Sequence, residues 1–259
     1  MARIFITGSA DGLGLMAGQL LASTGHEVTL HARDEARADT AQRALPKARA
    51  VVIGDVSTIA AMHSVAEQMN ALGRHDAVIH NVGIGYREPR RIVTVDGLSH
   101  LFAINVLAPY LLTALAKPPD RLVYLSSGMH SMGSAKLDDP QWERRSWNAS
   151  QAYADTKMLD VLLAFGVARL WPDVLSNALE PGWVATRMGG AAAGPVTQAW
   201  LAVSDEPAAR VTGRYFYHRA EKQPAEDAKH DELQEALLEY CEKLTGTSLV
   251  RATGERTLR

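Results

Sequence analysis

The sequence has only one cysteine, Cys241, so it can form neither an intrachain disulfide nor a zinc site built on cysteine ligands. Its nine histidines are scattered, with no His-Glu-x-x-His motif and no close pair at the spacing of metal ligands. We therefore predict no metal site.

Long apolar runs are also missing, and none approaches the length needed to span a bilayer. The chain passes from Met1 straight into a predicted strand, without the charged, apolar and small-residue succession of a signal peptide. We therefore expect a cytoplasmic protein with no membrane partner.

The sequence carries no large excess of charge of either sign, with 27 basic and 29 acidic residues. A net charge of −2 does not indicate binding to nucleic acid. The arginines at 251, 256 and 259 are interpreted as a solvated tail. A chain of 259 residues, 47% of them hydrophobic, is sufficient for one large domain, which we predict to span 1–259.

Strand-like apolar runs alternate with helical segments along most of the chain. This alternation is typical of βαβ units and predicts an α/β fold, a doubly wound parallel sheet of the Rossmann type. The expected strands are Arg3–Thr7, Glu27–His31, Ala50–Ile53, Ala77–Asn81, Arg121–Ser126, Leu175–Glu180 and Arg214–Tyr217. The expected helices are Leu13–Ser23, Glu35–Ala44, Ile59–Leu72, Leu98–Leu115, Ala152–Trp171 and Asp227–Leu244.

A glycine-rich turn separates the first predicted strand from the first predicted helix. Gly8, Gly12 and Gly14 follow the spacing Gly-x-x-x-Gly-x-Gly. Such a turn lets the backbone approach a pyrophosphate, and the helix N-terminus offers unpaired N–H groups and the positive end of its dipole. The strand before and the helix after it favour a nucleotide-binding loop over a simple tight turn.

Tyr153 and Lys157 lie four residues apart at the start of a predicted helix. Because residues i and i+4 share a helix face, the Lys157 ammonium can approach the Tyr153 phenol and lower its pKa. Beside a bound nicotinamide, such a tyrosine can exchange a proton while the cofactor exchanges a hydride. In a chain with a nucleotide-binding loop, the pair indicates an oxidoreductase.

The glycine loop Thr7–Gly14 and the Tyr-x-x-x-Lys pair together resemble the short-chain dehydrogenase/reductase superfamily, and the resemblance extends to about Tyr217. Asp55-Val56 resembles the acidic position that contacts adenine, and Asn81-Val82-Gly83 resembles the Asn-Ala-Gly turn. Pro181 to Thr186 resembles the Pro-Gly segment, in which Thr186 would contact the nicotinamide amide. The cofactor contacts that the resemblance implies are Gly8, Ser9, Asp11, Gly12, Leu13, Gly14, Asp55, Val56, Asn81, Val82, Gly83, Tyr153, Lys157, Pro181, Gly182, Val184 and Thr186.

The resemblance also implies the catalytic residues. Tyr153 would be the general acid in reduction and the general base in oxidation. Lys157 would lower its pKa and hold the nicotinamide ribose, and Asn105 would support a proton relay. A serine after the fifth strand would polarise a substrate carbonyl. Ser126 and Ser127 both lie there, and Ser127 matches the family's position.

The end of the second predicted strand favours NADP(H) over NAD(H). An NAD enzyme usually carries an acid there for the ribose 2′-hydroxyl, whereas NADP requires a positive group. Ala32 takes the place of the acid, and Arg33 can bind a 2′-phosphate. Asp34 is expected to cap the next helix. The glycine loop has no Lys or Arg, and Ser9 could donate one hydrogen bond instead.

The stretch between Ser127 and Tyr153 is longer than in many members, with an insertion at about 128–151. It resembles the branch of retinol dehydrogenases and related carbonyl reductases. Ser131 and Ser134 also lie in it, so the choice of hydroxyl stays open.

Large side chains are frequent in this insertion and in a substrate loop expected at about 187–212. They either line a wide apolar pocket for a bulky carbonyl or alcohol, or the tryptophans pin the insertion to the fold. We expect His130 to be a surface or hydrogen-bonded residue rather than a second acid. The residues concerned are Met129, His130, Met132, Trp142, Trp147, Trp183, Met188 and Trp200.

Other functions were weighed against this one. A serine hydrolase is disfavoured because no serine has the Gly-x-Ser-x-Gly spacing. A non-catalytic NADP(H)-binding sensor and a reductase of a carbonyl-activated C=C bond stay open as alternatives. Relatives form a homodimer or homotetramer through the helices that correspond to Leu98–Leu115 and Ala152–Trp171, and here a monomer or dimer is expected as readily as a tetramer. The C-terminal helix, at about 227–244, would pack on the body or on a partner subunit.

Overall fold

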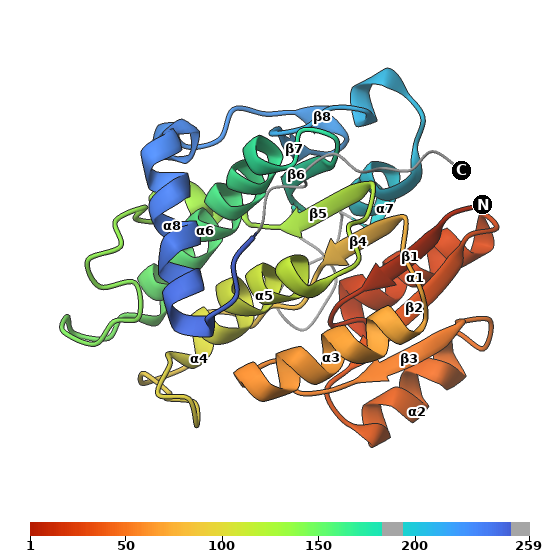
Figure 1. Cartoon of the computed structure of the whole chain (residues 1–259), viewed down its shortest axis with the longest axis horizontal. Coiled ribbons are helices and arrows are strands. Elements are labelled where there is room, and N and C mark those ends of the chain that lie inside the picture. The colour runs from red at the N-terminus through yellow and green to blue at the C-terminus, as the bar shows by residue number, and fades with distance from the viewer. Residues whose placement is uncertain (183–193, 250–259) are drawn as a thin grey trace.

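The computed structural model describes residues 1–182 and 194–249. These residues form one eight-stranded sheet in the order β3-β2-β1-β4-β5-β6-β7-β8, with helices on both faces (Figure 1). The predicted doubly wound α/β fold is confirmed, except that β8 runs antiparallel to β7. The strands are β1 Arg3–Ile6, β2 Glu27–Ala32, β3 Ala50–Ile53, β4 Ala77–His80, β5 Arg121–Leu125, β6 Leu175–Glu180, β7 Tyr215–Tyr217 and β8 Ala220–Glu221.

Helices and shorter helical turns connect the strands. The predictions at Trp183, Val184, Thr186 and Met188, and at the three terminal arginines, lie outside the described residues. None of the helices within the described ranges is long and apolar enough to cross a bilayer. The α-helices are α1 Gly12–Ser23, α2 Glu35–Ala44, α3 Ile59–Ala71, α4 His100–Phe102, α5 Ala108–Leu115, α6 Ala149–Leu170, α7 Val196–Val203 and α8 Asp231–Thr245.

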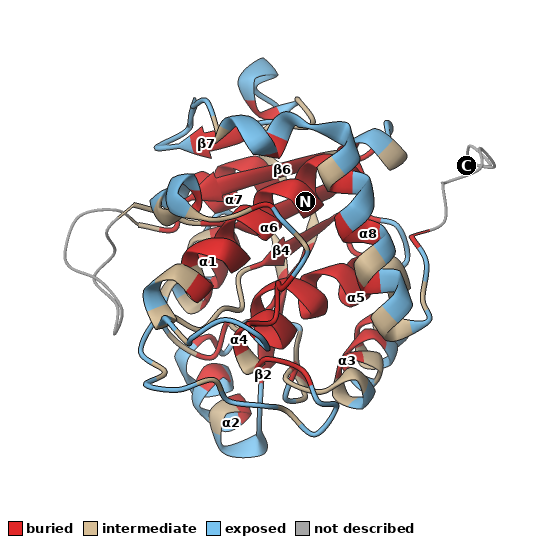
Figure 2. Cartoon of the chain, turned by 90° about the vertical axis from the view of Figure 1, so that its left-hand side faces the viewer, coloured by how far each residue is buried: buried red, intermediate tan, exposed pale blue. Residues whose placement is uncertain are grey.

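The core consists of two main apolar clusters, one on each face of the sheet. Helices α3, α5, α6 and α8 contribute to the first cluster, and α1, α2 and α7 contribute to the second. Figure 2 shows strands and α6 buried, whereas α2 and α8 each expose one side. The sheet therefore presents only its two edges and its two ends to solvent, and the carboxyl ends of its parallel strands are where ligands bind in such folds.

The long helix predicted at Leu98–Leu115 is divided into three parts. Between α4 and α5 the backbone forms a π-helix, Ala103–Leu107, with Asn105 at its centre. The Asn105 amide forms hydrogen bonds with both the N–H and the carbonyl of Ile84, over 2.8 and 3.0 Å. A wider turn of this kind is frequent at functional sites.

Two further elements differ from expectation. Part of the substrate loop predicted at 187–212 is helix α7. The C-terminal helix predicted at Asp227–Leu244 is a 3-10 turn, Glu226–Lys229, followed by α8. Helix α8 ends at Gly246, which has a left-handed φ of 66°, as is common at a helix end.

Helix α8 packs on the body of its own chain, along α6 and α5 (Figure 1). A Cβ added to Gly166 of α6 would lie 3.2 Å from Leu238 of α8, so the two helices approach closely there. Tyr110 of α5 donates to the Thr247 carbonyl over 2.8 Å. Helix α8 thus covers part of α5 and α6, the two helices expected to contact another subunit.

Candidate active site

The glycine loop is fixed to the end of β4 by hydrogen bonds. The Thr7 hydroxyl accepts from the backbone N–H groups of Asn81 and Val82, each over 3.0 Å. The Asn81 amide donates to the carbonyls of Thr7 and Gly8. Gly8 has a φ of 60°, and a Cβ there would lie 2.8 Å from the Val82 Cα. The loop and the Asn-Val-Gly turn are therefore one rigid unit.

Hydrogen bonds of Ser9 and His31 also hold this loop in place. The buried Ser9 hydroxyl donates to the Ile6 carbonyl over 2.7 Å and accepts from the His31 N–H. A hydroxyl has one hydrogen, so this arrangement argues against the predicted bond from Ser9 to a 2′-phosphate. The His31 ring accepts from the Gly8 N–H over 2.9 Å, with its Nε2 2.9 Å from the Gly54 carbonyl. Burial lowers the pKa of His31 to about 4.

Helix α1 begins at the loop and opens toward the expected cofactor. The Asp11 side chain forms no capping hydrogen bond to the first turn of α1, which leaves first-turn N–H groups available for a phosphate. The Asp11 carboxylate instead lies 2.6 Å from the Arg37 guanidinium of α2. Gly14 is close-packed, since a Cβ there would lie 2.5 Å from the Asn81 amide nitrogen. The Leu13 carbonyl accepts from Gln198 of α7.

Arg33 and Arg37 are the cations beside the end of β2. Arg33 is exposed and pairs with Asp34 over 3.3 Å. Asp34 caps α2 by accepting from the Arg37 N–H over 2.9 Å, as predicted. Arg37 was not predicted from the sequence, although it lies only four residues after Arg33 (37 − 33). Arg37 lies at the glycine loop through Asp11, and Arg33 is exposed directly after β2.

The remaining predicted cofactor residues lie at the carboxyl ends of β3, β4 and β6. Asp55 is exposed and accepts from the Ser57 N–H over 3.1 Å, while Val56 is buried. Pro181 and Gly182 directly follow β6, and Gly182 has a φ of 73°. The predicted cofactor residues that the structure describes therefore lie together at the carboxyl end of the sheet.

Tyr153 and Lys157 share a face of α6, as the spacing predicts. The Lys157 Nζ lies 5.8 Å from the centroid of the Tyr153 ring. Lys157 is buried and donates to the Leu125 carbonyl over 2.8 Å and to the Asp160 carboxylate over 2.6 Å. Burial opposes the charge on Lys157, but Asp160 and Tyr153 more than offset it and raise the pKa of the ammonium.

Asn105 and Lys157 meet at Gly83, at the end of β4. A Cβ added to Gly83 would lie 3.6 Å from both the Asn105 carbonyl oxygen and the Lys157 Nζ. Asn105 also donates to the Thr156 hydroxyl over 3.0 Å, which ties the π-helix to α6. A side chain at Gly83 would be in van der Waals contact with both polar groups, so both lie close to this turn.

The two serines after β5 differ in their surroundings. Ser126 is buried and its hydroxyl donates to the Lys157 carbonyl over 2.7 Å. Ser127 is half-buried, and its hydroxyl accepts from the Met129 N–H over 3.2 Å, leaving its own hydrogen for a substrate. In the insertion, Ser131 is exposed and donates to Gly128. The structure thus favours Ser127 as the group that polarises a carbonyl.

Known proteins with similar sequences identify this arrangement. A family model described as short chain dehydrogenase matches residues 2–135. An uncharacterized oxidoreductase of Emericella nidulans is 39% identical, covering 96% of this chain and 99% of its own. The chain belongs to the short-chain dehydrogenase family. Human retinol dehydrogenase 13 is 28% identical over 94% of this chain and 84% of its own, so the resemblance to the retinol dehydrogenase branch is confirmed.

Solved structures agree on the fold. A protein from Mycobacterium paratuberculosis has a TM-score of 0.81 at 24% identity, covering 96% of this chain and 95% of its own. A blue fluorescent protein from a metagenomic library, solved in complex with NADPH, has a TM-score of 0.66 at 24% identity, covering 83% and 95%. This short-chain dehydrogenase is therefore a hydride-transfer oxidoreductase with a Rossmann-type fold.

The insertion at about 128–151 is anchored to α6 of the dehydrogenase by Asp155, a residue the sequence reasoning did not single out. The Asp155 carboxylate accepts from the Ser134 N–H, the Gln151 amide, the Trp142 indole and the Arg145 guanidinium, over 2.8 to 3.2 Å. Asp155 is buried between Tyr153 and Lys157 in the sequence of α6. The sequence carries no signal for this role, because Asp155 differs from a surface aspartate only through its partners in the fold.

The tryptophans serve mainly to pin segments of the chain. Trp142 is buried and packs edge-on against Trp147, and the Arg145 guanidinium lies 3.8 Å from its ring centroid. Trp200 packs on Phe216 in the second of the two apolar clusters, which favours a packing role over a place in a substrate pocket.

Two aromatic residues, Trp147 of the insertion and Tyr86, lie close to Tyr153. Trp147 is half-buried and belongs to the cluster that includes Tyr153. Tyr86 is 38% exposed, and its ring lies edge-on to Tyr153 with centroids 5.6 Å apart. His130 is buried and hydrogen-bonded, as expected: its Nδ1 lies 2.8 Å from the Ser127 carbonyl, and its Nε2 accepts from the Ala225 N–H.

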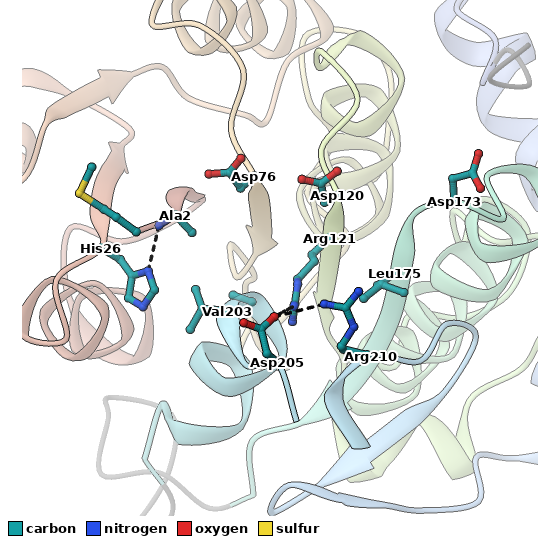
Figure 3. A pocket seen from close by; sticks show the side chains of 12 residues that line it. Ala2, His26, Asp76, Asp120, Arg121, Asp173, Leu175, Val203, Asp205 and Arg210 are labelled. Atoms are coloured by element: carbon teal, nitrogen blue, oxygen red, sulfur yellow. Dashed lines mark hydrogen bonds and ion pairs between the residues drawn. The ribbon is translucent and has the colours of Figure 1, made fainter. Parts of the chain in front are cut away.

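A polar hollow of about 500 Å³ lies at the opposite end of the sheet, where the parallel strands begin (Figure 3). Within it the Arg121 guanidinium donates to the carbonyls of Leu201 and Ser204, and Asp205 lies between Arg121 and Arg210. These charges are paired within the protein. The hollow is separate from the candidate active site, because that site lies where the parallel strands end. Across residues 1–182 and 194–249, no group of three or more acidic, histidine or cysteine side chains could hold a metal ion.

Proposed function

We propose that this short-chain dehydrogenase is NADP(H)-dependent and acts on a carbonyl/alcohol pair of a bulky, apolar substrate. The observation that carries the proposal is the meeting of Lys157 and Asn105 at Gly83, with Tyr153 on the same face of α6. The glycine loop and the N-terminus of α1, which could bind a pyrophosphate, lie at the same carboxyl end of the sheet.

The residues of the chain have distinct roles in this proposal. When bound, a nicotinamide cofactor supplies or accepts the hydride. In reduction, Tyr153 donates its phenolic proton to the carbonyl oxygen, and Ser127 donates a hydrogen bond to the same oxygen. Lys157 holds a ribose hydroxyl with its remaining N–H and stabilises the phenolate that forms. Asn105 supports the water or hydroxyl through which the phenolate regains a proton.

Two arginines support the preference for NADP(H). Arg33 follows β2, and Arg37 lies one helical turn further, against the glycine loop. A 2′-phosphate carries the charge that such guanidinium groups bind in pairs. The solved NADPH complex of a protein with the same fold is consistent with this preference.

Aromatic side chains beside Tyr153 support a bulky substrate. Tyr86 and Trp147 offer apolar surface at the reacting residue, and Tyr86 is partly exposed. Because Ser127, Tyr153 and Lys157 are all present, a non-catalytic sensor is disfavoured.

The first experiment is a titration of the protein with NADPH and with NADH, followed by tryptophan fluorescence. We expect tighter binding of NADPH, and then consumption of NADPH with bulky ketones or aldehydes, measured by its absorbance. Tighter binding of NADH would overturn the cofactor preference. Binding of neither nucleotide would overturn the proposed function as a whole.

A further inference from the structure

Lys157, beside the proposed acid Tyr153, forms a buried ion pair with Asp160. The Lys157 Nζ and the Asp160 carboxylate are 2.6 Å apart, with side chains 6% and 3% exposed. The same ammonium donates to the Leu125 carbonyl at the end of β5. Two of the three N–H groups of Lys157 are therefore committed to the chain, and their directions fix where the third one points.

We propose that Asp160 is a positioning residue that fixes the Lys157 ammonium beside Tyr153 and offsets part of its charge, so that the Tyr153 phenol keeps its proton to a higher pH. This inference rests on the roles proposed for Tyr153 and Lys157. It adds a residue whose charge opposes the effect of the lysine.

The surroundings leave Asp160 as the counter-charge of Lys157. Tyr124 of β5 faces Asp160, and burial raises the pKa of this phenol, which is therefore neutral. His80 of β4 stacks on Tyr124, and burial lowers its pKa to about 3, so it is neutral too. The Thr113 hydroxyl of α5 lies 2.9 Å from the His80 Nε2 and 2.8 Å from the Tyr124 hydroxyl.

The pair is ionised at neutral pH. Burial raises the pKa of Asp160 to about 6, and Lys157 opposes that rise. Above this pH the carboxylate and the ammonium form a pair of no net charge, and Tyr153 experiences the difference between them. Asp160 lies seven positions after Tyr153 on α6 (160 − 153), whereas Lys157 lies four positions after it (157 − 153). The carboxylate therefore comes from the next helical turn beyond Lys157 and offsets the lysine only in part. Removing the negative charge at this range should lower the midpoint of the phenol by about one pH unit.

The offset has a consequence for the pH dependence of the reaction. A phenol that stays protonated to higher pH can act as the acid in reduction over a wider pH range. An uncompensated lysine would favour the phenolate at lower pH, which is the form that acts as the base in oxidation. Asp160 thus moves the pH range in which each form of Tyr153 is present.

The test is Asp160→Asn, which keeps the shape and leaves an oxygen to accept from Lys157 but removes the charge. The phenol of Tyr153 is titrated by the ultraviolet absorbance of tyrosinate, in the protein without nucleotide. Subtracting the titration of the matching Tyr153→Phe variant isolates Tyr153 from the other tyrosines. We expect its midpoint to fall by about one pH unit in Asp160→Asn. The basic limb of the pH profile for reduction should move by the same amount.

Asp205→Asn is the matched control, because it removes one negative charge at the other end of the sheet, where the parallel strands begin. It should leave the Tyr153 midpoint unchanged. An unchanged midpoint in folded Asp160→Asn overturns the inference, since a purely structural aspartate would change only the melting temperature. If the amide prevents folding, Asp160→Ser provides the same test, because it is neutral and leaves room for a water at Nζ.

Failure of the proposed function has a different signature. If Tyr153→Phe retained normal turnover, the role of the tyrosine would be wrong, although the phenol titration would still report the charge of Asp160. If Tyr153→Phe is inactive but Asp160→Asn leaves the midpoint in place, only the inference about Asp160 fails.

Discussion

The Asp155 carboxylate accepts a hydrogen bond from the Trp142 indole over 3.2 Å, with both side chains buried. Trp142 has a φ of 57°, a left-handed conformation that a bulky residue rarely adopts. The bond connects the middle of the insertion to the residue that lies between Tyr153 and Lys157. The insertion is therefore held in place by the same helix that carries the proposed acid.

Replacing Asp155 should uncouple the insertion from α6. We expect Asp155→Ala to lower the free energy of unfolding by about 3 kcal/mol, because several buried donors lose their acceptor. The KM for substrate should rise, whereas the Kd of NADPH should change little. Denaturant unfolding and fluorescence titration measure these effects. Asp138→Ala, on the exposed surface of the same insertion, is the control and should cost less than about 0.5 kcal/mol. Equal effects of the two variants would contradict the anchoring role.

Replacing Tyr153 tests the reaction itself. In Tyr153→Phe, we expect kcat for NADPH-dependent reduction to fall by about 10² to 10⁴, because the proton donor is lost. The Kd of NADPH, measured by tryptophan fluorescence, should stay within about twofold, because a single uncharged hydrogen bond is lost at most. Tyr217→Phe, on the exposed end of β7, is the matched control and should retain normal turnover. Normal turnover in Tyr153→Phe would exclude it as the acid.

Arg33 and Arg37 should distinguish the two cofactors. Arg33→Ala and Arg37→Ala are each expected to weaken NADPH by about tenfold or more while affecting NADH little, because only NADPH has a 2′-phosphate. Asp11→Asn should strengthen NADPH binding, because the carboxylate competes with the phosphate for Arg37. Titrations with both nucleotides measure these effects. Arg43→Ala, at the far end of α2, is the control, and equal losses for NADH and NADPH would disprove the cofactor preference.

His31 should make the fold sensitive to acid. Burial lowers its pKa to about 4 in the folded protein, whereas an unfolded histidine titrates near 6.5. The unfolded chain therefore binds the proton first as the pH falls. The contribution of His31 is complete above pH 6.5 and decreases toward pH 4, by up to about 3 kcal/mol. His31→Gln should flatten this part of the stability profile, measured by denaturant unfolding across pH. The exposed His218→Gln should not, and an equal slope in both variants would contradict the assignment.

The sequence predicted the local elements well where local signals decide them. The bounds of α2, β3 and β6 agree with the prediction residue for residue, and the predicted Asp34 cap is confirmed. The glycine loop and the shared face of Tyr153 and Lys157 follow from spacing alone.

Other features depend on contacts between distant segments and could not be predicted in this way. The π-helix requires the bond from Asn105 to Ile84, and the role of Asp155 requires four partners from the insertion. Asp160 resembled any polar residue on a helix until the fold buried it against Lys157. Arg37 is the exception, because its place one turn after Arg33 was visible in the sequence.

Helix α8 has a further consequence for how this enzyme is handled and assayed. Its contact with α6 and α5 is made within one chain, so forming it is a first-order process that does not depend on meeting another molecule. A dehydrogenase whose central helices are covered by a neighbouring subunit loses that cover on dilution. In this one the cover that α8 provides is retained in a dilute assay as in a concentrated stock.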